Sequence, residues 1–209
     1  MVVERKFISD SIVKDEITKY LAQKLSRAGF SRIDIQKTPM LTRITVHVTN
    51  PGKVIGRGGE TIKQLTTSLK EKFDVEEPQI NVAEVQNPML EPRLVAKYIA
   101  NALERGARAR SLLHGVLKEI VDNGAMGVEI IATGKLAAKS AQARSMKLMY
   151  GYIPKAGYVV KLANEAHVAS YPKYGAIGIT VRIVQPGTIF PGREIKKAVA
   201  LPKSIEGAS

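Results

Sequence analysis

The 209-residue chain contains no cysteine and no tryptophan, and it has only 7 tyrosines and 4 phenylalanines. The absence of cysteine excludes disulfide bonds and thiolate metal sites. With so few aromatic side chains, the hydrophobic cores must be mostly aliphatic. No stretch approaches the roughly 18 uninterrupted apolar residues of a membrane-spanning helix, and residues 1–6 lack the apolar region of a secretory signal. We therefore expect a soluble, cytoplasmic protein without a membrane partner.

Acidic residues are also scarce. The chain carries 32 Lys and Arg residues against 19 Asp and Glu residues, a formal net charge of +13. Residues 1–87 hold 14 basic and 11 acidic side chains, whereas residues 88–209 hold 18 and 8, and no acid lies between Glu129 and Glu165. A surface rich in ion pairs usually keeps the two signs balanced. Neutralisation of phosphates accounts better for such an acid-free interval, so the composition favours a polyanionic partner.

The first half of the chain predicts one compact unit that mixes helices and strands, residues 1–87. Ser9 or Asp10 can cap its first helix, and Gly29 stands where a C-terminal glycine is expected. The periodicities predict, in order, a helix over 9–29, strands over 33–37 and 44–49, a short helix over 51–55, a glycine loop at 56–59, a helix over 62–73 and a strand over 80–85.

The second half predicts two helices followed by a sheet, residues 88–187, and a loosely ordered basic tail over 188–209. Residues 137–150 fit either a helix or a strand. The fold class is therefore α/β (α+β) with two small domains. The predicted elements are helices that start at Pro92 and after Gly106, and strands over 128–132, 158–162 and 177–183.

The sharpest local motif is the glycine loop Gly56-Arg57-Gly58-Gly59. Glycines permit positive φ and let a nucleic-acid backbone approach the main chain, and the loop opens a helix, whose N-terminus attracts anions. A Gly-x-x-Gly tetrapeptide is also common in structural turns. The surrounding order of elements resembles the type-two KH fold, in which such a loop clamps about four nucleotides.

A second signal is one face of the helix after Gly106. At 100° per residue, Arg110, Ser111, His114 and Lys118 fall on one side, and the apolar residues occupy the other. A solvated face explains such a stripe equally well. A third signal is the basic segment from Lys135 to Lys155, in which small residues let a backbone press against RNA while cations meet phosphates.

An enzyme is the main alternative class. The three histidines, His47, His114 and His167, lie on separate predicted elements, and none has the spacing of a metal site. Neither a catalytic triad nor a carboxylate pair is indicated. We expect no cofactor, no metal and no catalytic residue. Another alternative is a free-standing KH protein that acts in RNA processing or ribosome assembly.

The whole chain resembles the S-three family of small-subunit ribosomal proteins over about residues 5–187. The Ser145-Met146-Lys147 segment and the short tail resemble archaeal relatives more than bacterial ones. The resemblance is carried by Val54-Ile55-Gly56-Arg57-Gly58-Gly59-Glu60, Gly124-Ala125-Met126-Gly127-Val128-Glu129-Ile130, Thr133-Gly134-Lys135-Leu136 and Tyr174-Gly175-Ala176-Ile177-Gly178-Ile179-Thr180-Val181.

This resemblance implies a structural protein of the small-subunit head. It implies binding to small-subunit ribosomal RNA, contacts with neighbouring head proteins, and a part in the channel through which mRNA enters. A basic helix face is linked in the family to unwinding of structured mRNA; Arg110 and His114 match it, while Ser111 departs from it. The candidate RNA-binding residues are Gly56, Arg57, Gly58, Gly59, Lys63, Arg108, Arg110, His114, Lys118, Lys135, Lys139, Arg144, Lys147 and Lys155.

Overall fold

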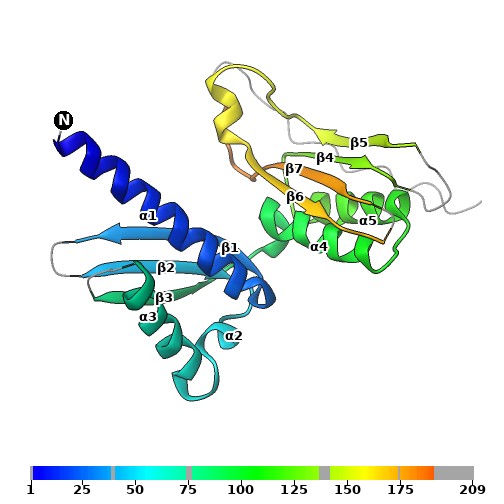
Figure 1. Ribbon diagram of the computed structural model, residues 1–209. Coiled ribbons are helices and arrows are strands. Elements are labelled where there is room, and N and C mark those ends of the chain that lie inside the picture. Colours follow the sequence, from blue (N-terminus) through cyan, green and yellow to red (C-terminus); the bar gives the residue numbers. More distant parts are fainter. Residues whose placement is uncertain (1, 39–40, 74–76, 137–141, 174, 191–209) are drawn as a thin grey trace, which may run out of the picture. The chain divides into compact units, whose positions relative to one another are not determined.

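The computed structural model describes residues 2–38, 41–73, 77–136, 142–173 and 175–190. Its contacts divide the chain into unit 1, Met1–Pro88, and unit 2, Met89–Ser209. Each unit is a sheet with helices packed on one face (Figure 1). The predicted mixture of helices and strands in two parts is therefore confirmed.

Unit 1 contains a three-stranded sheet in the order β1-β2-β3. Strand β1 runs antiparallel to β2, and β2 runs parallel to β3. A parallel pair needs a long crossover, and the helix–loop–helix segment supplies it, which confirms the predicted order. Its elements are α1 (Val2–Lys24), β1 (Phe30–Lys37), β2 (Thr42–Val48), α2 (Pro51–Ile55), α3 (Glu60–Phe73) and β3 (Pro78–Glu84), with 3₁₀ turns at Ser26–Ala28 and Arg57–Gly59.

The core of unit 1 lies between its helices and its central strand. Ile44, Val46 and Val48 alternate along β2 and are buried, and they pack with Leu21 of α1 and Leu69 of α3. The alternation has the period of a strand with one buried face, as predicted.

The predicted start of the first helix is wrong. Ser9 and Asp10 lie inside α1, which begins at Val2. No glycine or proline interrupts residues 2–24, so nothing in the backbone stops the helix before the predicted caps.

Unit 2 contains a fully antiparallel sheet in the order β5-β4-β7-β6. Helix α4 packs against β6 and β7, and α5 packs against β4 and β5, so both helices cover one face. The elements are α4 (Pro92–Glu104), α5 (Ala109–Asp122), β4 (Gly127–Gly134), β5 (Arg144–Gly151), β6 (Asn164–Ser170) and β7 (Ile177–Val184), with 3₁₀ turns at Pro88–Leu90 and Tyr158–Leu162.

The strand predicted over 158–162 is wrong. Tyr158–Leu162 forms a 3₁₀ turn that Gly157 enters with φ 75°. The next strand is β6, which pairs with β7 at the edge of the sheet. The sequence pattern did not predict this strand. The ambiguous segment 137–150 contains strand β5 from Arg144 onward, and residues 137–141 lie outside the described ranges.

Two further expectations concern the end of the chain and the membrane. Of the predicted tail, residues 188–190 are described, and the buried Phe190 ring meets Tyr152 edge-on with centroids 5.3 Å apart. Within the ranges given above, no helix is both long and apolar enough to cross a bilayer.

The two faces of the unit 2 sheet differ sharply. Val128, Ile130 and Ala132 of β4 are buried in the core beneath the helices. Because side chains alternate along a strand, Glu129 and Ile131 point to the other face, which neither α4 nor α5 covers. This surface is the open face of the sheet.

Candidate nucleic-acid interface

The glycine loop forms a single turn between α2 and α3. Gly58 has φ 61° and ψ 18°, the left-handed conformation that side chains other than Asn and Asp rarely adopt. Arg57 and Gly58 are exposed, and a Cβ added at Gly58 would meet nothing within 4 Å. The loop thus presents bare backbone and one cation to the solvent, as the motif predicted.

The helices on either side of the glycine loop are anchored in the core of unit 1. Val54 of α2 and Leu65 of α3 are buried in the core of unit 1 and anchor the two helices that flank the turn. Lys63 is exposed on the first turns of α3, and Ile55 is an exposed apolar side chain next to the glycines. The loop therefore projects from a fixed base, with a cation and an apolar group close by in the sequence.

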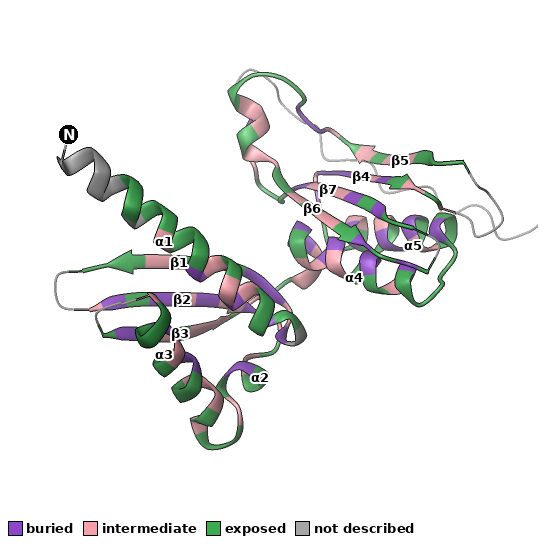
Figure 2. Ribbon diagram, viewed as in Figure 1, coloured by how far each residue is buried: buried purple, intermediate pink, exposed green. Residues whose placement is uncertain are grey.

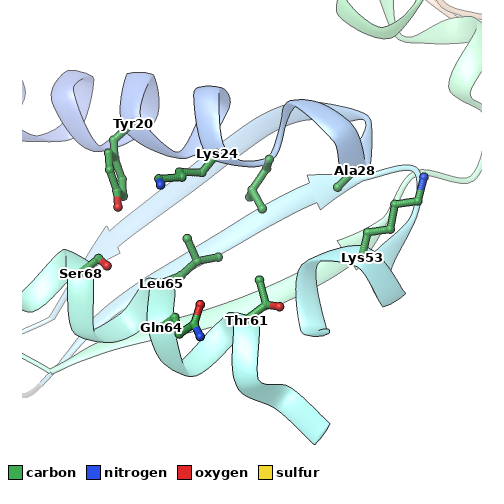
Figure 3. A pocket seen from close by; sticks show the side chains of 9 residues that line it. Tyr20, Lys24, Ala28, Lys53, Thr61, Gln64, Leu65 and Ser68 are labelled. Carbon is green, nitrogen blue, oxygen red and sulfur yellow. The ribbon is translucent and has the colours of Figure 1, made fainter. Parts of the chain in front are cut away.

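A half-open cavity of about 380 Å³ lies between α1 and α3. Figure 3 shows Tyr20 and Lys24 reaching from α1 toward the α3 side chains that include Gln64. The Lys72 ammonium lies 4.7 Å from the centre of the Tyr20 ring. This mixed polar and apolar cavity was not predicted, since its walls come from helices far apart in the sequence.

Helix α5 carries the predicted basic stripe. Arg110, His114 and Lys118 are exposed, whereas Leu113 and Val116 are buried against the sheet. Figure 2 shows exposed and buried positions alternating along this helix. Spacings of four residues keep the three polar side chains on one side.

Arg108 and Ser111 extend this surface at the start of the helix. Arg108 is the exposed N-cap residue of α5, and Ser111 is exposed within its first turn. The stripe therefore begins at the N-terminus of α5, which is the positive end of the helix dipole.

Two further candidates, Lys135 and Arg144, lie at one end of the unit 2 sheet. Arg144 opens β5 opposite Gly134, the last residue of β4, and Lys135 follows at once. Lys135 and Arg144 are both exposed. Lys139 lies outside the described residues.

The remaining candidates, Lys147 and Lys155, gather around a buried acid on the open face. The Glu129 side chain is 1% exposed, and its Oε1 lies 2.8 Å from Lys147 Nζ and 3.9 Å from Lys155 Nζ. Arg182 Nη1 donates a hydrogen bond to Glu129 Oε2 at 3.1 Å. Two lysines of the acid-free interval are therefore paired with the acid at its border, which the composition did not predict.

The strand register explains how this cluster forms. Glu129 of β4 lies directly opposite Arg182 of β7, which lies directly opposite Glu165 of β6. Arg182 Nη2 also pairs with Glu165 Oε1 at 2.8 Å. His167 continues the network, 2.9 Å from the same Glu165 oxygen. Arg182 and Glu165 were not predicted as part of a site, because only the register brings them beside Glu129.

The cluster shifts the ionisation of its members. Burial alone would raise the pKa of Glu129, but hydrogen bonds from Lys147 and Arg182 outweigh it and hold that pKa below its ordinary 4.5. The hydrogen bond to Glu129 raises the pKa of Lys147, and the one to Glu165 raises the pKa of Arg182. Lys147 in turn lowers the pKa of its neighbour Lys155. Glu129, Lys147 and Arg182 are therefore all ionised at neutral pH.

The three histidines belong to different elements. His47 pairs with Asp34 at 3.0 Å in unit 1, His114 is exposed on α5, and His167 belongs to the open face of unit 2. Among the described residues, no group of three or more His, Asp or Glu side chains is arranged to hold a metal ion.

The candidate residues thus fall on separate surfaces. The α5 stripe lies on the helical side of unit 2, whereas Lys147 and Lys155 lie on the open face of the sheet. The glycine loop belongs to unit 1. The geometry is that of several positive or bare-backbone contact points.

Comparisons with known proteins cover most of the chain. A family model described as KH domain matches residues 16–90, and one described as ribosomal protein S3, C-terminal domain, matches residues 99–183. Small ribosomal subunit protein uS3 of Methanococcus maripaludis is 40% identical over 191 residues, 91% of this chain and 90% of the relative. The uS3 proteins of Methanocorpusculum labreanum and Methanococcus aeolicus are 38% and 37% identical and match 97% and 98% of this chain, and 87% and 98% of their own lengths.

Proposed function

Because the chain belongs to the uS3 family of small ribosomal subunit proteins, we propose that it binds small-subunit ribosomal RNA in the head and helps form the channel through which mRNA enters. It is a structural component of the ribosome and not an enzyme, and the relatives named above are archaeal, as the sequence predicted. Its site of action is the ribosome in the cytoplasm, beside other proteins of the small-subunit head.

The observation that carries the proposal is the exposure of the predicted contact residues. Arg57 and Gly58 project from unit 1, and Arg110, His114 and Lys118 line α5 on unit 2. RNA backbones are bound by such cations and by main chain that glycine leaves uncovered. The rRNA is the polyanion that a net charge of +13 requires.

The loop is tested by two substitutions at Gly58. Gly58→Asp and Gly58→Asn tolerate the left-handed backbone equally well, and both side chains enter open space. Only the aspartate repels a phosphate. We expect crosslinking of the loop to rRNA in intact subunits to fall for Gly58→Asp and to persist for Gly58→Asn. Equal crosslinking of the two variants would refute the role of the loop.

The α5 stripe is tested by charge reversal of Arg110 and Lys118. Both side chains are exposed, so the double change to Glu should leave unit 2 folded. We expect slower translation of messages with a stable hairpin and normal translation of messages without one. Normal rates on both messages would remove the mRNA role and leave the rRNA role untouched.

A KH protein that visits the ribosome transiently is the remaining alternative. Binding through about 6 phosphates weakens about a thousandfold between roughly 50 and 200 mM salt, so a single-site factor is removed by a salt wash. A protein held at several surfaces remains with the small subunit. Sedimentation of salt-washed subunits separates the two cases.

A further inference from the structure

Glu129 is an unusual residue for an open sheet face. Its side chain is 1% exposed, although the residues beside it on this face include the exposed Met149 and Lys147. Burying a carboxylate is unfavourable unless charged partners surround it. The apolar core of unit 2 lies on the other face, so the packing of the helices does not require an acid here.

The partners that bury Glu129 are themselves cations. Lys147, Lys155 and Arg182 approach the two carboxylate oxygens at 2.8, 3.9 and 3.1 Å. Arg182 is clamped on its other side by Glu165 at 2.8 Å. The cluster holds three cationic side chains and two carboxylates, so an excess of positive charge remains.

The two lysines expose this excess positive charge to the solvent. Arg182 lies between two carboxylates, which pair with its Nη1 and Nη2 atoms. Lys147 and Lys155 remain 42% and 54% exposed while their ammonium groups converge on the same oxygen. Two ammonium groups that would otherwise repel each other are thereby held side by side. Such a pair matches a phosphate, which offers several acceptor oxygens to neighbouring donors.

We infer that Glu129 is a positioning residue, which holds Lys147 and Lys155 as a preorganised site for an RNA phosphate on the open face of unit 2. The inference rests on the proposed RNA-binding function and adds Glu129 and Arg182 to the residues that serve it. Holding flexible lysines in place before binding reduces the entropy lost on association. Hydroxyl groups on the same face, Thr133 and Ser145 at 3.4 Å from each other, suit a polar backbone.

The decisive measurement is the affinity of the full chain for a labelled small-subunit rRNA fragment, with Glu129→Gln compared with Glu119→Gln. Both substitutions remove one negative charge, but Glu119 is exposed on α5. If charge alone matters, both variants bind RNA as tightly as the wild type or more tightly. The positioning role predicts that Glu129→Gln binds about threefold or more weakly, although its net charge has increased. Equal or tighter binding by Glu129→Gln overturns the inference.

A second variant guards against loss of the fold in Glu129→Gln. Lys155 is the outermost cation, 3.9 Å from the acid, so Lys155→Gln leaves the contacts of Glu129 with Lys147 and Arg182 in place. We expect the slope of log affinity against log salt to shrink by about 1, with an unchanged melting temperature. An unchanged slope contradicts the phosphate contact.

The failures of the two proposals are distinguishable. Absence of RNA binding by the wild type would reject the proposed function. If neither Glu129→Gln nor Lys155→Gln changes the affinity for RNA, only this site would be rejected. If the variants lose binding to poly-glutamate while RNA affinity is unchanged, the site belongs to an acidic protein segment, and the RNA assignment is overturned.

Discussion

Units 1 and 2 present positive potential in physically different ways. In unit 1, the proposed contact surface is main chain, exposed by glycines within four consecutive residues, 56–59. In unit 2, the proposed surface is made of long side chains, and the cations on the open face come from β5, β7 and the segment after β5. The first surface depends on backbone conformation, and the second depends on ion pairing.

This difference matches the distribution of charge. Residues 1–87 have a net charge of +3 from 14 basic and 11 acidic side chains, and residues 88–209 have +10 from 18 and 8. A backbone site needs little net charge, because glycine and a helix N-terminus provide the attraction. A side-chain site concentrates cations that repel one another, and on the open face the buried Glu129 pairs with two of them, Lys147 and Lys155. The two units should respond to different substitutions.

The largest expected effect tests whether the units are energetically separate. Ile130 is fully buried beneath the helices of unit 2, so Ile130→Ala should lower the free energy of unfolding of that unit by about 2–5 kcal/mol. Chemical denaturation, followed separately by probes in each unit, should show unit 2 unfolding earlier and unit 1 unchanged.

The neighbouring Ile131 provides a matched control on the opposite face. It is partly exposed, and Ile131→Ala should cost only about 1 kcal/mol. Equal losses at both positions would show that the two faces of the sheet do not differ as described. If Ile130→Ala also lowered the stability of unit 1, the two units would not unfold independently.

A smaller effect is expected at the glycine loop. Gly56 has φ 74° and ψ −179°, a conformation nearly restricted to glycine, and an added Cβ would overlap the Thr61 hydroxyl. Gly56→Ala should therefore cost about 3 kcal/mol, whereas Gly58→Ala, which enters open space, should cost about 1 kcal/mol. Thermal unfolding of unit 1 measures both. A larger loss of stability for Gly58→Ala than for Gly56→Ala would contradict this assignment of the restricted conformation to Gly56.

The smallest effect concerns acid. Because the folded-state pKa of Glu129 is depressed, its stabilising contribution is complete above its ordinary pKa and is lost as the pH falls through the folded-state value. Between about pH 5 and pH 3, the melting temperature of unit 2 should fall further in the wild type than in Glu129→Gln. Parallel pH profiles would mean that the acid contributes nothing to the unit.

Local patterns predicted much of the fold. The alternation of Ile44, Val46 and Val48, the apolar spacing in α5 and Pro92 at the start of α4 each depend on neighbours within one element. The glycine loop is equally local, since its conformation is determined by four residues and the helix that follows.

The features that were missed depend on tertiary structure. Tyr158–Leu162 alternates like a strand, but β6 occupies the sheet edge. Strand β6 itself reads as polar, because Glu165 and His167 face the ion network. Likewise, the pairing of Glu129 with Arg182 follows from a register between strands about 50 residues apart, which no local period reveals.

The order of strands also bears on how the protein is made. The sheet of unit 1 is complete once β3 ends at Glu84. In unit 2, β4 pairs with β7 (Ile177–Val184), so the sheet cannot be completed before β7 has been translated. Helix α4 packs on β6 and β7. During synthesis from the N-terminus, the apolar side of α4 therefore stays uncovered until β6 and β7 have been translated, whereas α5 can pack against β4 and β5 earlier. Transiently exposed surface of this kind favours aggregation, so a nascent chain halted after β5 is far more vulnerable than one halted after β3.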